Sequence, residues 1–159
     1  MKWCALLLCA WPVLAQKTHE FCAACHTEQV TDFQSHPHFQ KNLSCDICHG
    51  ASVKHRTSTG AAAPDRVAAP DEVPALCGTC HEAALKEYLT SKHAALLAQR
   101  AKVKTANCGG CHGVHGFRAA AQIERQCHRC HSSLPASHPK MQNASCTSCH
   151  AKHTLAAKR

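Results

Sequence analysis

The chain has 159 residues, of which 18 are lysine or arginine, 10 are aspartate or glutamate, 15 are histidine and 14 are cysteine. Only 4% are aromatic, so a chain of this length cannot bury a sizeable apolar core of its own. So many cysteines and histidines indicate metal or cofactor chemistry, and we expect no nucleic-acid partner despite the formal net charge of +8.

Residues 1–15 have the pattern of a secretory signal peptide. A lysine precedes an apolar run from Ala5 to Ala15, which is broken by Pro12 and ends in small residues before the polar Gln16. The run is too short to span a bilayer, and no later apolar stretch is long enough either. We therefore expect a periplasmic or extracellular protein with no integral membrane segment.

Six copies of Cys-x-x-Cys-His follow in the sequence. Their cysteines are Cys22, Cys25, Cys45, Cys48, Cys77, Cys80, Cys108, Cys111, Cys127, Cys130, Cys146 and Cys149. Their histidines are His26, His49, His81, His112, His131 and His150. A lone Cys-x-x-Cys more often marks half a zinc site or a redox dithiol, but a histidine after all six pairs is not a chance pattern. In this pentapeptide the thiols bind c-type haem covalently and the histidine is the proximal iron ligand, which predicts six haems.

The motifs form three similar units, each with a histidine between its two motifs and another after the second. We expect dihaem modules at residues 16–55, 75–118 and 119–159. Residues 56–74 contain three prolines and are predicted to be either an extended linker or a surface loop.

The histidines outside the motifs can supply the distal iron ligand. One in each gap and one after each second motif gives His38, His55, His93, His115, His138 and His153. His36 is an alternative to His38, because it shares a Ser-His-Pro setting with His138. His19 is an alternative for the first haem. His128 lies inside a Cys-x-x-Cys and is expected to be exposed or to face a propionate.

The expected fold is mostly irregular with short α-helices and no significant β-sheet, and stacked haems form its core. The longest helical pattern covers Glu82 to about Lys102. Without haem we expect the chain to be largely disordered, as metal-dependent small domains are.

Charge is distributed unevenly along the expected mature chain. Residues 16–85 have a net charge of −3, and residues 86–159 have a net charge of +10. Ionised haem propionates would make the first half strongly acidic and leave the second mildly basic. Such opposed ends would steer the protein towards different donor and acceptor proteins.

The six motifs, with the Cys-His-Gly and following histidine at His49 to His55 and at His112 to His115, resemble multihaem c-type cytochromes with doubled motifs. That family includes periplasmic pentahaem and decahaem electron-transfer proteins. The resemblance implies bis-histidine haems in a row that serve as an electron-transfer wire between redox proteins, in respiratory or extracellular electron transfer. An enzyme would need an open iron position, so we expect no catalytic residues.

Two alternatives remain open at this point. The chain could be an electron-donating or catalytic subunit of a multihaem reductase, or a unit of an extracellular cytochrome polymer. In either role it could dock on a membrane-associated or outer-membrane electron-transfer complex.

Overall fold

The computed structural model describes residues 18–99, 106–139 and 144–158, so the predicted signal peptide lies outside the described residues. The described helices are α1 (Thr18–Ala23), α2 (Thr27–Gln34), α3 (Pro37–Gln40), α4 (Cys45–His49), α5 (Val53–Thr57), α6 (Val73–Gly78), α7 (Glu82–Leu89), α8 (Lys92–Ala98), α9 (Cys108–His112), α10 (Ala120–Cys130) and α11 (Cys146–Cys149). Outside them, these residues show only one isolated β-bridge, between His150 and Ala157. The predicted fold class, short helices and irregular segments without a sheet, is confirmed.

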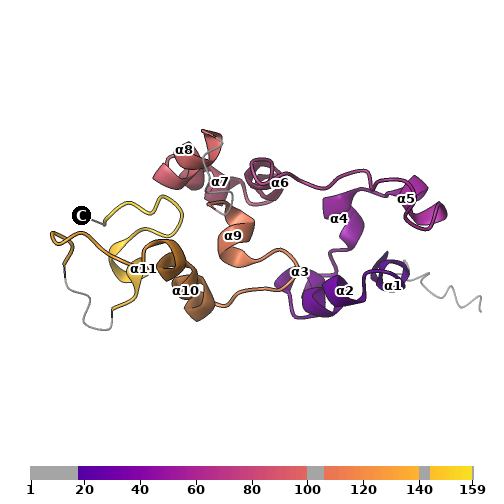
Figure 1. The fold of residues 1–159 in the computed structure, drawn as a ribbon, viewed down its shortest axis with the longest axis horizontal. Coiled ribbons are helices and arrows are strands. Elements are labelled where there is room, and N and C mark those ends of the chain that lie inside the picture. Colours follow the sequence, from indigo (N-terminus) through magenta and orange to yellow (C-terminus); the bar gives the residue numbers. More distant parts are fainter. Residues whose placement is uncertain (1–17, 100–105, 140–143, 159) are drawn as a thin grey trace, which may run out of the picture.

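The helices are strung along an elongated molecule (Figure 1). Helices α1 and α5 lie at one end, and α10 and α11 lie towards the other, with α6 and α9 between them. The contacts between elements follow the same order, because α1 packs on α2 and α4, α6 packs on α7 and α9, and α10 packs on α9 and α11.

The first motif of each module sits where a helix ends. Its histidine follows the helix with nearly the same backbone angles each time, namely φ −110° and ψ 48° at His26, −105° and 51° at His81, and −103° and 54° at His131. In each case the histidine N–H donates to the carbonyl of the first motif cysteine. The repeat seen in the sequence is therefore also a repeat of local structure.

The second motif of each module forms a helix of its own, α4, α9 or α11. Gly50 and Gly113 follow the first two of these helices with φ of 74° and 79°, in the region that favours glycine. A Cβ atom at Gly113 would lie 1.9 Å from the carbonyl oxygen of Gly116. No other residue fits this turn, which sends the chain on from α9.

The long helix expected from Glu82 to about Lys102 is wrong, because the described part breaks into α7 and α8 at Thr90 and Ser91. The Ser91 hydroxyl accepts a hydrogen bond from the Ala94 N–H (3.1 Å) and so caps α8. This break folds α8 back on α7, and residues 100–102 lie outside the described part of the chain.

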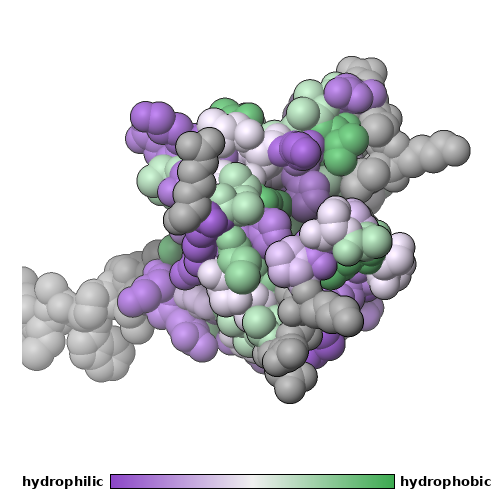
Figure 2. All heavy atoms as spheres, turned by 90° about the vertical axis from the view of Figure 1, so that its left-hand side faces the viewer, coloured by the Kyte–Doolittle hydropathy of each residue, from purple (hydrophilic) through white to green (hydrophobic). Residues whose placement is uncertain are grey.

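The turn between α7 and α8 creates the small apolar core of the described residues. Its buried members are Tyr88, Ala94 and Leu97, and the Tyr88 hydroxyl donates to the Ala106 carbonyl (2.6 Å). Elsewhere large apolar side chains are open to solvent; Phe21, for instance, is 59% exposed and Val67 is 71% exposed. Figure 2 looks at the end that carries α10 and α11, where hydrophobic and hydrophilic side chains are interspersed. The described polypeptide therefore buries too little apolar surface to explain a stable fold by itself.

Residues 56–74, the predicted linker or surface loop, include the end of α5 and the beginning of α6, and Asp65 and Arg66 between these helices contact residues 47–52 in and around the second motif. The Asp65 carboxylate accepts from the Ser52 N–H (2.7 Å), and the Arg66 guanidinium donates to the carbonyls of Cys48 (2.6 Å) and Ile47 (3.0 Å). These contacts make the middle of the segment a packed loop.

Among the described helices, none is both long and apolar enough to cross a membrane.

Candidate functional site

Each motif histidine faces one histidine from outside the motifs. We number these six pairs as sites 1 to 6 in the order of the motifs. The pairs are His26 with His55, His49 with His115, His81 with His38, His112 with His153, His131 with His93, and His150 with His138. The ring centroids in these pairs are 5.8 to 6.3 Å apart and the ring planes are inclined by 16 to 42°. The other ring contacts of the described residues span a wider range, 4.6 to 5.9 Å.

This spacing suits two imidazoles on opposite sides of one metal ion. Two metal–nitrogen bonds of about 2 Å and two ring radii of about 1.1 Å together span about 6 Å when the ligands are opposed. Imidazoles at a tetrahedral angle would instead have centroids about 5 Å apart. The observed distances favour opposed ligands, as on a six-coordinate haem iron.

A tetrahedral zinc site of two cysteines and two histidines does not form at any of the pairs. Such a site needs four donor atoms close together. Among the described residues, the one cluster of three or more such donors consists of Glu124, His128 and Cys146, none of which belongs to a histidine pair. The zinc interpretation of the Cys-x-x-Cys motifs is therefore unsupported at these sites, while opposed imidazoles beside two motif cysteines fit a covalent haem.

Several paired imidazoles are held by a hydrogen bond from Nδ1. The Nδ1–H groups of His49, His55, His138 and His150 donate to main-chain carbonyls of Arg66 (3.1 Å), Ala62 (2.8 Å), Pro139 (2.9 Å) and Leu155 (3.0 Å). Because a carbonyl can only accept, these bonds place the proton on Nδ1 and leave the Nε2 lone pair available to a metal.

Burial favours the neutral, metal-binding form of other paired imidazoles. It lowers the pKa of His93, and the nearby charge of the partner His131 lowers that pKa further. Burial also lowers the pKa of His112 and His115, again with a contribution from the histidine opposite each of them. Because only a neutral imidazole can ligate iron, these environments suit a ligand role.

The motif thiols come together in the same way in each module. The first cysteine of the first motif lies near the first cysteine of the second, in the pairs Cys22 with Cys45, Cys77 with Cys108 and Cys127 with Cys146. Burial, with the Cys22 thiol alongside, raises the pKa of Cys45 to about 11. The neighbouring Cys108 thiol lowers the pKa of Cys77 to about 7. Paired motifs therefore lie side by side within a module.

Adjacent modules also meet through their motifs. Burial raises the pKa of Cys48, and nearby Cys77 and Cys80 raise it further, so the second motif lies beside the third. Burial and the neighbouring Cys127 raise the pKa of Cys111 in the same way, which brings the fourth motif beside the fifth. Each motif therefore lies beside the next one in the chain. The helices that carry motif cysteines, α1, α4, α6, α9, α10 and α11, follow one another along the molecule in the same order (Figure 1).

The second histidine of a site is usually supplied by a neighbouring module. Between modules, His38 and His93 each lie in a gap and reach forward to sites 3 and 5. His115 and His153 each follow a second motif and reach back to sites 2 and 4. The first and last sites differ, because each takes both imidazoles from its own module.

The alternative ligands His36 and His19 have different surroundings. The ring of His36 is buried against Phe33 and Phe117, and its Nδ1 accepts from the His38 N–H (3.1 Å). In this position His36 caps α3 and orients the segment that carries His38. His19 is buried against Phe33 and Phe39, with Nδ1 3.5 Å from the Cys45 sulfur.

In each module a cationic side chain donates hydrogen bonds to main-chain carbonyls of the second motif's helix. These three residues were not predicted from the sequence. Arg66 donates in this way to α4, and Arg118 donates to the carbonyls of Gly110 (2.8 Å) and Gly109 (3.2 Å) in α9. Lys158 donates to the carbonyls of Thr147 (2.7 Å) and Ser148 (3.3 Å) in α11. These donors satisfy terminal carbonyls and complement the helix dipole. Their recurrence was hidden because they lie at different distances along the chain from their motifs.

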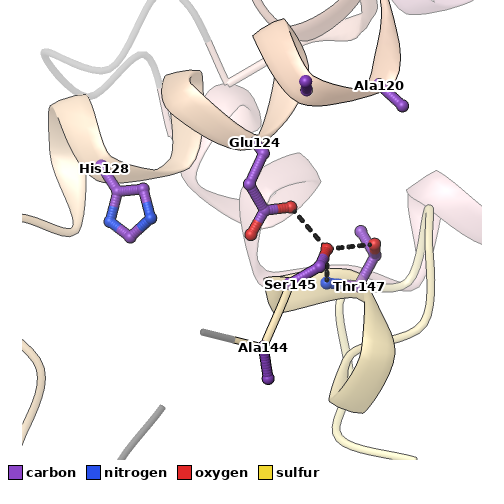
Figure 3. A pocket seen from close by; sticks show the side chains of 7 residues that line it. Ala120, Glu124, His128, Ala144, Ser145 and Thr147 are labelled. Atoms are coloured by element: carbon purple, nitrogen blue, oxygen red, sulfur yellow. Dashed lines mark hydrogen bonds between the residues drawn. The ribbon is translucent and has the colours of Figure 1, made fainter. Parts of the chain in front are cut away.

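Glu124 joins the fifth and sixth motifs (Figure 3). Its carboxylate accepts from the Ser145 hydroxyl (2.8 Å) and from the Cys146 N–H (2.5 Å), which holds the beginning of α11 against α10. Exposed His128 also points into this open pocket. Glu124, His128 and Cys146 have donor atoms within 4.8 Å of one another, but a thioether at Cys146 would make a weak ligand for a divalent ion. The hydrogen bonds account for the position of Glu124 without a metal.

Comparison of the chain with protein-family models, with curated proteins and with solved structures found no match.

Proposed function

We propose that the chain is an exported hexahaem c-type cytochrome that carries electrons between redox proteins. The observation that carries this proposal is the pairing of all six motif histidines with six histidines from outside the motifs at a nearly constant distance. In each site the two motif cysteines would bind the haem covalently and the paired imidazoles would ligate the iron, which supplies one-electron redox chemistry.

The same pairs favour electron transfer over catalysis. Binding and reducing a substrate at iron requires a free coordination position. Every motif histidine has a second imidazole across from it, so all six sites have the residues for complete axial coordination. This arrangement gives no support to the reductase alternative.

The order of the sites supports transport from end to end. Adjacent motifs lie close enough for their thiols to affect one another, both within modules and between them. A donor protein at one end and an acceptor at the other would make use of this row. The signal-like residues 1–15 support a periplasmic or extracellular location, where such a protein could also dock on a membrane-associated complex.

The test is the haem content and coordination of the protein exported from a host that matures c-type cytochromes. Intact mass should show six haem additions, and a spectrum with all haems low-spin should not change with carbon monoxide or cyanide. The variant Cys127→Ser with Cys130→Ser should lose one haem addition and serves as a matched control. Four or fewer haems as the main species, disulfide-linked thiols in their place, or a full equivalent of haem that binds carbon monoxide would overturn the proposal.

A further inference from the structure

One imidazole of the six pairs has a different kind of hydrogen-bond partner. At site 4, Nδ1 of His153 lies 3.2 Å from Oε2 of Glu87. The Nδ1 bonds of His49, His55, His138 and His150, the four other paired imidazoles described above with such a bond, end on main-chain carbonyls. Among the described residues, Glu87 is the carboxylate in hydrogen-bond contact with a paired imidazole.

The two contact residues come from distant parts of the chain. Glu87 lies in α7 of the second module, 66 residues before His153, which follows the last motif. His153 in turn pairs with His112 of the second module. Glu87 therefore helps to hold a C-terminal imidazole against a site of the second module.

A carboxylate affects an imidazole more strongly than a carbonyl does. It carries a full negative charge and takes a larger share of the Nδ1 proton, so the ring becomes a more basic ligand. A more basic ligand, with a negative charge beside it, stabilises ferric iron relative to ferrous iron. Both effects lower the reduction potential of a haem at that site.

We propose that Glu87 is a positioning residue that lowers the reduction potential of the haem at site 4 through its hydrogen bond to His153. This inference rests on the proposed function, because it assumes a haem between His112 and His153. Site 4 lies between sites 3 and 5, so Glu87 tunes an interior position of the row and neither end of it.

The test compares Glu87→Gln with wild type in the fully loaded protein. Glutamine has nearly the same shape and can still accept a hydrogen bond, but it has no charge. The reduction potential of one haem should rise, because its preference for ferric over ferrous iron should fall by about tenfold, the size of effect that hydrogen-bond partners of metal ligands have on metal affinity. Tenfold corresponds to 59 mV for one electron. The low-spin EPR signal of one haem should also shift.

Two further variants make the result specific. Glu20→Gln removes the same charge from an exposed residue of α1, at the other end of the molecule, and should leave the site 4 component unchanged. His153→Ala should convert the haem of site 4 to a form that binds carbon monoxide and so identify its component in the titration. If that component keeps its potential and EPR signal in Glu87→Gln while six haems remain attached, the inference is overturned and the proposed function stands. If six haems are not attached in wild type, the proposed function itself fails.

Discussion

Sites 1 and 6 at the ends of the molecule take both histidines from one module, whereas the four sites between them take the second histidine from a neighbouring module. The first two modules each contribute a gap histidine to the next module, and the last two each contribute a tail histidine to the previous one. The other two stay in their own modules, where His55 faces His26 at site 1 and His138 faces His150 at site 6. One rule of exchange therefore describes the four interior pairs, and the two end pairs depart from it.

This difference shows how a chain with a small apolar core can behave as one unit. In a simple array of repeats, each unit contacts its neighbours only through a packed interface. Here an interior site is complete only when two modules contribute to it, so ligation would link the modules as well as build the sites. Sites 1 and 6 would not link modules, because each takes both of its histidines from one module.

The largest expected effect comes from removing all the haems, whose ligation would link the modules. If the chain is exported without haem attachment, the described residues bury too little apolar surface to hold the helices together. Far-ultraviolet circular dichroism should then lose most of its helical signal relative to the loaded protein, with fast amide hydrogen exchange throughout. A haem-free chain with slow exchange in α4 or α9 would contradict this account.

A smaller effect should separate the interior from the ends. His38→Ala and His55→Ala each remove one histidine of the first module, but only His38 reaches another module. Each variant should open one haem to carbon monoxide. His38→Ala should cost more free energy of unfolding, by about 2 kcal/mol or more, because it also cuts a link between modules. Chemical denaturation of both variants checks this difference. Equal losses of unfolding free energy would show that a histidine contributed by a neighbouring module does not stabilise the contact between the two modules.

Replacing the cationic residues that donate to the helices of the second motifs should destabilise the protein by a smaller amount. Arg118 is partly buried and donates to three carbonyls of α9, so Arg118→Ala should destabilise by about 1–2 kcal/mol, as hydrogen bonds from charged groups do. Arg66→Ala should cost less, since Arg66 is more exposed. Exposed Arg125 is the control, and Arg125→Ala should change the unfolding midpoint very little. Equal midpoints for all three variants would leave the recurring cations without a structural role.

Much of the candidate site could be predicted from the sequence because the chemistry is local there. The pentapeptide motif specifies two thiols and one imidazole whatever the rest of the chain does. The six predicted distal histidines are also the ones that face motif histidines, and recurrence in three modules pointed to them. His38 rather than His36 faces a motif ring, because the Ser-His-Pro setting of His36 turns its side chain onto the backbone of α3.

The pairing of histidines with sites could not be predicted, because it depends on how modules pack. His38 lies closer in sequence to either motif of its own module than to His81, yet it faces His81. The helix after Glu82 was misjudged for a related reason. Its apolar spacing continues past Thr90, but Ser91 caps a new helix and lets Leu97 fold back on Tyr88. A local polar cap outweighed the periodic pattern at that point.

The smallest effect should appear only in the rate at which each end meets its partner. Glu20→Lys reverses an exposed charge at the α1 end, and Lys152→Glu reverses one near the C-terminus. Lys152 is the better probe there because Lys158 closes α11, and its loss would also disturb structure. Each change should slow electron exchange a few-fold with one partner only, and the slowing should fade as salt screens exposed charges. Stopped-flow kinetics at several ionic strengths checks this, with the reduction potentials expected to stay fixed. Slowing with both partners from either change would mean that the charge asymmetry does not distinguish the two ends.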